Sequence, residues 1–305
     1  MNNSRSYPLV SIITPAYNQA EFLVATIQSV LSQSYPNIEY IVLDDGSTDH
    51  TQDILKKYDG KIRWESHENM GQAKTLNRGW EMSKGEVLSY LSSDDLLDEH
   101  AIRNLMEKYV GDSLIIFGAY RLIDQTGQKI KTKKTIFHGY KDMVHNFNCP
   151  IGPGAVFSRD LFLDSGGWNQ NFRQIPDYDF WIRAGRHAKF IKIDEEIASF
   201  RVHTGSQTFA SSTANKSDES IVCINQLFDK SEDLEIKFNK KMSLASAYVY
   251  SSCLHFRSGR YIESIERLIQ SILYGGYYAF SLRNVTRFFG SFYSIFKYKY
   301  IEKNK

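Results

Sequence analysis

Apolar strands and amphipathic helices alternate at short spacing along the first hundred residues. The predicted strands are residues 9–14, 40–43, 62–65 and 86–91, and the predicted helices run from Asn18 to about Tyr35, over 51–58 and over 72–83. Pro15 ends the first strand, and Asn18 followed by Glu21 has the spacing of a capping box. This β-α-β-α-β-α-β order predicts an α/β fold with a mostly parallel, doubly wound sheet.

Polar side chains gather where three of the predicted strands end. Residues 15–17 follow the first strand, Asp44 and Asp45 the second, and Asp94 and Asp95 the fourth. Because ligands of doubly wound sheets bind beyond the carboxyl ends of the strands, we expect a ligand site at this edge. Two adjacent carboxylates repel each other, so the last pair indicates a hard cation, a sugar hydroxyl or plain exposure to water. The shared edge favours a ligand.

Beyond residue 110 the pattern changes twice. The predicted strands are residues 114–123, 189–193 and 197–202, and a helix is predicted over 177–187. Small polar residues dominate 211–219, which predicts a linker or a mobile lid. The remaining chain predicts helices, among them one helical hairpin over 245–272, without an internal repeat.

The composition narrows the class of protein. The chain has 305 residues, of which 42% are hydrophobic and 24% charged, as expected for a soluble globular protein. A net charge of +2 does not indicate a protein that binds nucleic acid. The three cysteines, Cys149, Cys223 and Cys253, form no CxxC motif and favour a reducing compartment. Without an apolar leader or a run of about 18 apolar residues, we expect a cytoplasmic protein.

Three blocks of sequence, at residues 10–49, 71–95 and 175–185, carry the polar groups in a fixed order. They resemble the signature blocks of glycosyltransferase family 2, over about residues 8–206. The resemblance implies a Rossmann-like GT-A fold and an inverting enzyme that uses a nucleotide sugar, with UDP-sugars favoured. It also implies Mg²⁺ or Mn²⁺ and a glycan or lipid-linked glycan as acceptor.

The same resemblance implies a division of the chain by function. A donor-binding half would cover residues 1–110 and an acceptor-binding half residues 111–210. The C-terminal region, 211–305, lies outside the resemblance and is expected to form a helical appendage. Whether the protein forms oligomers is left open.

By the resemblance, Pro15 and Tyr17 would line the nucleobase and ribose, and Asp45 would accept a hydrogen bond from the base. Lys74 would reach the diphosphate, although a solvated helix lysine is the alternative. For the neighbouring Asp44, Ser47 and Asp49 we favour strand-end and helix-capping roles.

The Asp94–Asp95 pair matches the metal motif of the family, with Ser93 where another acid could stand. Asp94 would meet the ribose or the metal, and Asp95 the metal directly. Hard oxygen donors of this kind suit Mg²⁺ or Mn²⁺. His203 would complete the metal shell, although a structural histidine is the alternative.

Asp177 matches the general base of the family, and Pro176 stands where a glutamate often precedes it. A sugar hydroxyl is a poor nucleophile at neutral pH, so a carboxylate must take its proton. Asp179 is the competing candidate, and Asp177 could also cap its helix. Trp168 and Trp181 could stack on a sugar, but a core position is favoured for Trp181.

The C-terminal region is aromatic and basic. Fifteen aromatic residues lie between Tyr248 and Tyr300, and residues 283–305 hold six Lys or Arg and one Glu, a charge of +5. One interpretation is attachment to the inner face of a membrane without a spanning helix. The other is a helical subdomain that packs on the catalytic part or on a partner.

Two other functions are weighed against a glycosyltransferase. A nucleotidyltransferase would carry a glycine-rich, basic phosphate loop after the first strand, and residues 14–22 contain neither feature. A nucleotide- or glycan-binding scaffold without activity would not need all of its acids. The joint presence of Asp45, Asp94, Asp95 and Asp177 argues against a decayed site.

Overall fold

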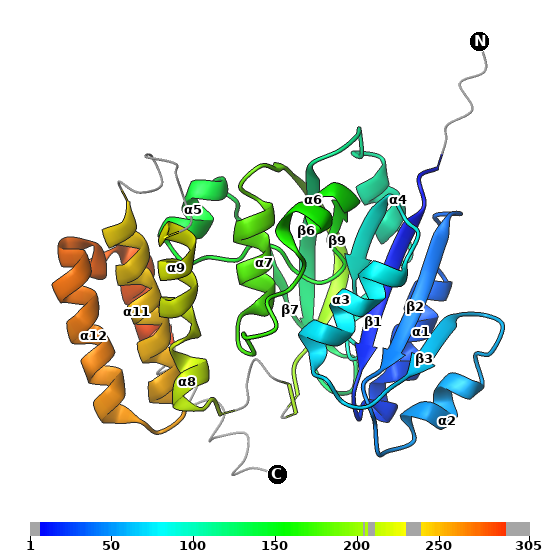
Figure 1. Ribbon diagram of the computed structural model, residues 1–305, viewed down its shortest axis with the longest axis horizontal. Helices are drawn as coiled ribbons and strands as arrows, with labels where there is room; N and C mark the ends of the chain where they lie inside the picture. The colour runs from blue at the N-terminus through cyan, green and yellow to red at the C-terminus, as the bar shows by residue number, and fades with distance from the viewer. Residues whose placement is uncertain (1–6, 204, 207–210, 230–238, 291–305) are drawn as a thin grey trace. The chain divides into compact units, whose positions relative to one another are not determined.

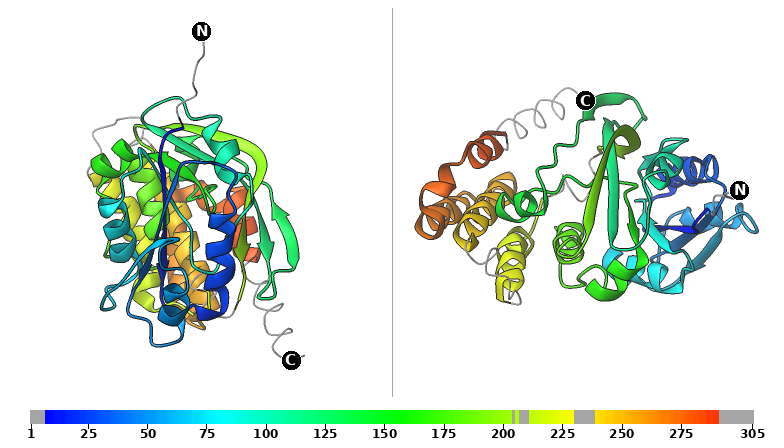
Figure 2. Two further views of the ribbon diagram at one scale, coloured as in Figure 1. Left: turned by 90° about the vertical axis from the view of Figure 1, so that its right-hand side faces the viewer. Right: turned by 90° about the horizontal axis from the view of Figure 1, so that it is seen from above.

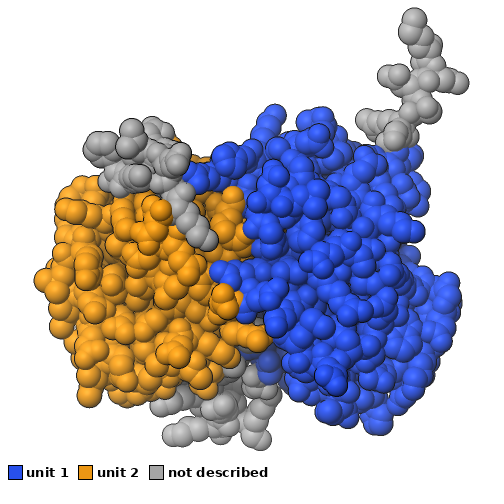
Figure 3. Space-filling view, in the orientation of Figure 1, with its two compact units in different colours: residues 1–137, 150–170, 184–206 blue, residues 138–149, 171–183, 207–305 orange. Residues whose placement is uncertain are grey.

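A computed structural model describes residues 7–203, 205–206, 211–229 and 239–290 (Figure 1). The chain forms two compact units (Figure 3). The first comprises residues 1–137, 150–170 and 184–206, and the second residues 138–149, 171–183 and 207–305. Residues 111–210, expected as one acceptor half, are therefore shared between the two units.

The first unit contains all the strands found in the described residues. They are β1 Val10–Ala16, β2 Ile38–Asp44, β3 Arg63–Ser66, β4 Val87–Tyr90, β5 Leu96–Leu97, β6 Leu114–Ile123, β7 Lys129–Lys133, β8 Val156–Ser158 and β9 Lys189–Arg201. Its helices are α1 Ala20–Leu31, α2 Thr51–Lys56, α3 Gln72–Met82, α4 Ala101–Met106 and α6 Arg159–Ser165.

These strands form one sheet in the order β3-β2-β1-β4-β8-β6-β9-β5, with β7 paired to β6. The α/β prediction is confirmed, and β3, β2, β1 and β4 are parallel as expected. The rest of the sheet is mixed, because β8 runs antiparallel to both β4 and β6. The expectation of a parallel sheet therefore holds for the N-terminal strands and for the β6–β9 pair, whereas β5, β7 and β8 run antiparallel to their neighbours.

Strand β1 runs on through Pro15 to Ala16 rather than stopping at the proline. Even-numbered residues of β1 bond towards β2, as the Ala16 carbonyl does in accepting the Asp45 amide at 2.8 Å. Odd-numbered residues bond towards β4, where the Ile13 carbonyl accepts the Leu91 amide. Pro15 is also an odd-numbered residue, but it lies beyond the last hydrogen bond between β1 and β4. Its missing N–H therefore removes no bond from the sheet.

Helix α1 is capped by a residue from another part of the chain, and the expected capping box at Asn18 does not form. The Asp49 carboxylate accepts the Ala20 amide and the Thr51 amide, each at 3.0 Å, and so caps the starts of both α1 and α2. Burial alone would raise the pKa of Asp49, but these bonds and that from the Thr51 hydroxyl hold it below its usual value. The capping role expected of Asp49 is confirmed.

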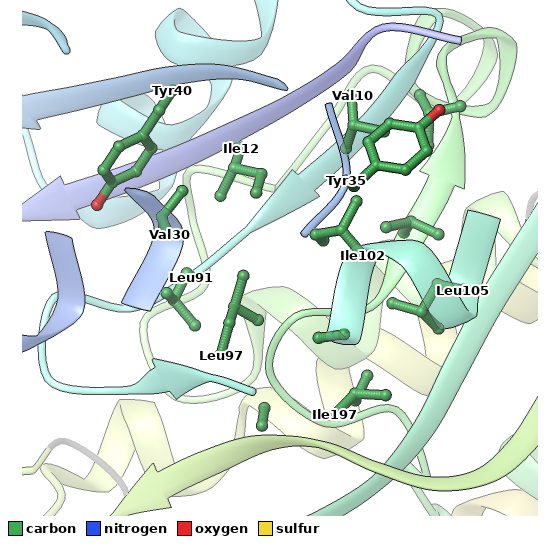
Figure 4. Close-up of a cluster of buried hydrophobic side chains, with 14 of the residues drawn as sticks. Val10, Ile12, Val30, Tyr35, Tyr40, Leu91, Leu97, Ile102, Leu105 and Ile197 are labelled. Carbon is green, nitrogen blue, oxygen red and sulfur yellow. The ribbon is translucent and has the colours of Figure 1, made fainter. Parts of the chain in front are cut away.

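Helices cover both faces of the parallel strands (Figure 2). On one face Val10 and Ile12 of β1 pack in a core with α1 and α4, which includes Val30 and Ile102 (Figure 4). On the other face α3 lies so close to β1 that a Cβ on Gly79 would come within 2.3 Å of Ile13 Cγ2. A glycine is required at this contact.

The second unit is helical. Its elements are α5 Tyr140–His145, α7 Pro176–Ala184, α8 Ala214–Ser217, α9 Glu219–Asp229, α11 Lys240–Arg257, α12 Tyr261–Gly275 and the 3₁₀ helix η1 Gly276–Phe280. Helix α11 packs between α9 and α12 (Figure 1). Within the described part of the chain, none of the helices combines the length and apolarity needed to cross a membrane.

Two acidic residues hold this unit together. Glu219, at the start of α9, accepts the backbone amides of Arg173, Gln174 and Ile175 at 2.8, 2.6 and 3.2 Å. These amides directly precede α7, so Glu219 caps that helix from a distant part of the sequence. The contact explains why residues 171–183 belong with the C-terminal helices.

Asp218 is the second of these residues. Its carboxylate accepts hydrogen bonds from Ser251 Oγ at 2.6 Å, His255 Nε2 at 3.1 Å and Arg267 Nε at 2.8 Å. Burial alone would raise the pKa of Asp218, but these bonds and the Arg267 charge lower it to about 2. The ionised carboxylate thus ties α11 and α12 to the start of α9.

We expect Asp218→Asn to lower the free energy of unfolding by about 1–2 kcal/mol near neutral pH, after allowance for solvent screening. A lowered pKa stabilises the fold above the unfolded pKa of about 4. This contribution is therefore lost as the pH falls from about 4 to about 2. Urea unfolding at neutral and acidic pH measures it, with the exposed Asp229→Asn as control. An equal loss at both pH values would contradict the prediction.

Candidate active site

Strand register brings the expected site residues of the first unit to one edge of the sheet. Ala16 lies beside Asp44, and Ile13 lies beside Tyr90, four residues before Asp94. The chain adds β2 and β3 on one side of β1 and then crosses through α3 to place β4 on the other side. Strand order reverses at this point, which is where doubly wound sheets bind ligands. The predicted convergence of strand ends is confirmed.

On the β1–β2 side, Pro15 is buried and Tyr17 is 48% exposed. The buried Asp45 carboxylate accepts the Met70 amide at 2.7 Å and the Gly71 amide at 2.9 Å, one on each oxygen. It therefore fixes the loop that leads into α3. Since each carboxylate oxygen can accept a second hydrogen bond, a base N–H could still be received.

Asp44 has a structural role. It is fully buried and accepts the Ser47 amide, Gln52 Nε2 and Ser66 Oγ at 2.7–3.0 Å. Ser47 in turn accepts the Asn18 amide. The strand-end and capping alternative is therefore confirmed for these residues.

Lys74 is exposed in the first turn of α3, three residues after Gly71. Among the described residues it has no hydrogen-bonding or ion-pairing partner. A free ammonium group at this position can bind an anion or remain solvated. Contact with a diphosphate stays a prediction.

His67 was not anticipated from the sequence. It directly follows β3, and its Nδ1 lies 2.9 Å from the Glu68 carbonyl oxygen and 3.6 Å from Asp45 Oδ1. Its buried Nε2 finds no partner within the described part of the chain. A lone histidine in a polar loop carries no motif, so only the fold places it beside Asp45.

The acid pair meets the end of β9. Asp94 Oδ2 lies 3.0 Å from His203 Nε2, and the Asp95 carboxylate accepts the Arg201 amide at 2.9 Å. The Arg201 guanidinium donates to the Asp94 carbonyl at 2.8 Å and stacks 4.8 Å from the centre of the Phe22 ring. Arg201, which the sequence marked only as a strand end, therefore fixes the turn that carries both acids.

The Asp95 carboxyl is buried beside a like charge. Burial and then the Asp94 carboxylate raise its pKa well above its usual value, and Arg201 only partly opposes them. The backbone amide of Arg201 donates a hydrogen bond to the Asp95 carboxylate, whereas its guanidinium donates to main-chain carbonyls. The site is thus short of positive charge, which a divalent cation would supply.

The spacing of Asp94 and His203 fits two ligands of one cation. Two neighbouring ligands in an octahedral shell at about 2.1 Å from the ion lie about 3.0 Å apart, as these two atoms do. Among the described residues, however, no three His, Cys, Asp or Glu side chains gather as a metal site. The Asp94–His203 contact is also that of an ordinary hydrogen bond, so binding of a cation by these residues stays a prediction.

Asp177 lies in the first turn of α7, in the second unit. Burial is the main cause that raises its pKa, Asp179 adds to it, and the amides of the first turn oppose it. Asp179, by contrast, accepts Arg183 Nε at 2.9 Å and Nη2 at 2.6 Å. An ion-paired carboxylate is a poor base, so the geometry favours Asp177 over its competitor.

Helix α11 also reaches this part of the second unit. Burial and then the charge of Asp177 raise the pKa of Tyr250 to about 12. The Tyr250 ring lies 4.8 Å from that of Phe147, which lies 4.2 Å from Tyr178. The C-terminal region therefore adds a ring to the aromatic cluster that holds Tyr178, the residue next to the candidate base, which the sequence did not indicate.

The two candidate tryptophans are core residues. Trp181 is 1% exposed and Trp168 3% exposed. The Trp168 amide donates to Asn77 Oδ1 at 2.8 Å, and its ring meets Trp80 and Tyr90 edge-on. The core interpretation of Trp181 is confirmed.

Comparison with known proteins decides the family. Residues 11–192, more than half of the chain, match the profile of the family described as "Glycosyl transferase family 2". The chain belongs to glycosyltransferase family 2. It is 29% identical to an uncharacterised glycosyltransferase of Rickettsia typhi over the whole of both chains. A putative teichuronic acid biosynthesis glycosyltransferase of Bacillus subtilis is 39% identical over 39% of this chain and 50% of its own.

Solved structures show the same fold. TarS of S. aureus, in complex with UDP-GlcNAc, superposes with a TM-score of 0.60 at 16% identity and covers 87% of this chain and 91% of its own. A mannosyltransferase from Pyrobaculum calidifontis, in complex with GDP-Man and Mn²⁺, gives a TM-score of 0.59 at 16% identity and covers 91% and 79%. This family 2 glycosyltransferase therefore has the GT-A fold, with additional C-terminal helices.

Proposed function

We propose that this glycosyltransferase inverts configuration as it moves a sugar from a nucleoside diphosphate, UDP in the first instance, to a hydroxyl of a glycan or lipid-linked glycan. The observation that carries the proposal is the convergence of Tyr17, Asp45 and the Asp94–His203 pair at one sheet edge. The nucleotide sugars bound by the two similar structures support the donor class. Family membership sets the nucleotidyltransferase alternative aside.

The donor would lie along this edge. Pro15 and the exposed Tyr17 ring would flank the base and ribose, and Asp45 would accept a base N–H while it holds the loop before α3. The free Lys74 ammonium would neutralise a phosphate. Asp94 would contact the ribose or a cation.

A divalent cation, Mg²⁺ or Mn²⁺, would bind Asp94, Asp95 and His203 together with donor phosphates and water. When bound, it would stabilise the negative charge of the departing nucleoside diphosphate. The spacing of Asp94 and His203 and the excess negative charge at Asp95 support this set. Arg201 would keep both acids in place through its contacts with the turn.

Asp177 would act as the general base. Its carboxylate would take the proton of the acceptor hydroxyl while that oxygen bonds to the anomeric carbon. The bond from the same carbon to the diphosphate breaks on the opposite side, and its electron pair leaves with the nucleoside diphosphate. The raised pKa of Asp177 makes it a stronger base than an ordinary aspartate.

The acceptor class is proposed more broadly, as a cell-surface polysaccharide or its lipid-linked precursor. The name of the Bacillus subtilis relative, which refers to teichuronic acid biosynthesis, supports this choice. The small number of cysteines, Cys149, Cys223 and Cys253, and their lack of a CxxC motif support a place in the reducing cytoplasm.

A thermal-shift screen tests the donor. UDP, UDP-GlcNAc, UDP-glucose, GDP and GDP-mannose are added with Mn²⁺ or with a chelator. We expect one base to raise the melting temperature, because a ligand that binds only the native state stabilises it by mass action. The shift should require Mn²⁺. No shift with any nucleotide would contradict the proposal.

A further inference from the structure

Helix α12 carries its large apolar side chains on the outside. Four isoleucines recur every three or four residues, so they share one face, and they are 44–74% exposed: Ile262, Ile265, Ile269 and Ile272. The buried positions of the helix are instead Ser264, Ser271 and Gly275. Surface helices of water-soluble proteins normally turn the apolar stripe to the core. In α12 this arrangement is reversed.

The inner face of α12 packs on α11 through small, hydrogen-bonded residues. Ser252 Oγ donates to the Ser264 carbonyl at 2.8 Å, and Ser264 Oγ donates to the Ser252 carbonyl at 3.0 Å. A Cβ on Gly275 would come within 2.2 Å of the Ala245 Cβ. Close packing by Ser, Ala and Gly is typical of helices whose other side faces lipid. The isoleucines are not needed for this contact.

The apolar surface continues past α12. Tyr277, Phe280, Leu282 and Phe289 are 64–81% exposed. Among the described residues, eleven of the twenty exposed large apolar side chains lie between Tyr261 and Phe289. We call this set the α12 surface; its members are Tyr261, Ile262, Ile265, Ile269, Ile272, Leu273, Tyr274, Tyr277, Phe280, Leu282 and Phe289. So large a group marks an interaction surface.

The chemistry of this stretch favours lipid. The arginines of this stretch are engaged within the protein, because Arg267 pairs with Asp218, Arg283 pairs with Asp142 and Arg287 donates to the Asn146 carbonyl. In the sequence, however, residues 291–305 add four Lys and one Glu, a net charge of +3 that exceeds the two charges of Glu263 and Glu266 and complements anionic headgroups. Tyrosine and phenylalanine alongside aliphatic residues suit the boundary between headgroups and acyl chains. With 15 residues, α12 is about 22 Å long, shorter than the hydrocarbon layer of about 30 Å.

We propose that the α12 surface lies flat on an anionic lipid bilayer and buries its isoleucines at the boundary between headgroups and acyl chains. The proposal does not depend on the donor or on the catalytic residues. It would bring the enzyme to the surface where a lipid-linked acceptor is found.

Sedimentation of the full-length protein with vesicles tests the proposal. We expect binding to vesicles of phosphatidylcholine mixed with phosphatidylglycerol, and weaker binding to phosphatidylcholine alone or at high salt. Ile265→Gln combined with Ile269→Gln should lower the partition coefficient at least about tenfold, because two side chains that would be buried among acyl chains become polar. Glutamine keeps the helix propensity of these exposed positions.

The matched control removes two exposed apolar side chains elsewhere, by Val110→Gln with Leu163→Gln, and should bind vesicles like the unaltered protein. If the first pair of substitutions disturbs folding in a thermal melt, Ile262→Gln with Ile272→Gln repeats the test. Equal binding by all variants, or no binding by the unaltered protein, would overturn the proposal. So would a dimer in lipid-free ultracentrifugation that the isoleucine substitutions dissociate, since a second copy would then cover the surface.

Discussion

Asp177→Asn is expected to lower turnover of the nucleotide sugar by a factor of about 10²–10⁴, the usual contribution of a positioned general base. Asparagine keeps the shape of the side chain, and Glu219 still caps α7, so the melting temperature should hardly change. Nucleotide affinity should also be unchanged, because the proposed donor groups belong to the first unit. Release of nucleoside diphosphate measures turnover, and calorimetry measures binding.

Asp179→Asn is the matched control. It breaks the buried ion pair with Arg183, so we expect a lower melting temperature and turnover that falls only with the folded fraction. The acid limb of the pH profile of kcat/KM should lie above the ordinary aspartate pKa of about 4, since burial raises that of Asp177. Full turnover by the Asp177 variant would remove it as the base.

Asp95→Asn should act on stability and binding in opposite directions. The carboxylate is buried beside Asp94, and among the described residues Arg201 bonds it through its amide and not its guanidinium, so removing its charge should raise the free energy of unfolding of the ligand-free protein by about 1 kcal/mol. Loss of a cation ligand should weaken Mn²⁺-dependent nucleotide binding at least about tenfold. Urea unfolding and calorimetry with and without Mn²⁺ measure the two effects.

Asp94→Asn provides the comparison. It loses the contact with His203, so it should weaken binding without the gain in stability. A less stable Asp95 variant with normal nucleotide affinity would mean that Asp95 serves only to hold the Arg201 amide. The opposite signs expected at two adjacent residues separate binding from folding.

Local patterns predicted most of the first unit. Strand β6 was predicted with its observed limits, because most of its residues are apolar and isoleucines stand near both of its ends. Strand β9 was expected as two strands around the acidic residues 194–196, but it is continuous. Its register with β6 shifts around Gly118, where the backbones approach so closely that a Cβ would meet the Glu195 carbonyl at 2.7 Å. This bulge absorbs the polar residues.

Some residues of the candidate site could be predicted from local patterns and others could not. Asp45, Asp94, Asp95 and Asp177 stand in short motifs that follow strands or open a helix, so sequence spacing was enough to find them. His67, Arg201 and Tyr250 contribute through contacts between distant parts of the chain. Such contacts leave no local pattern. The reversed face of α12 was missed because the hydrophobic period shows that a helix is amphipathic but not which side is buried.

The Glu219 contact bears on how such enzymes can be recombined. The family match ends at residue 192, which suggests a catalytic module that could be joined to the C-terminal helices of another relative. Yet the three amides that open α7 are capped by a glutamate beyond that boundary. A chimera joined between residues 206 and 219 would keep Asp177 but discard the carboxylate that anchors its helix. A catalytic module taken from this enzyme should therefore keep the helix that starts at Glu219 together with α7.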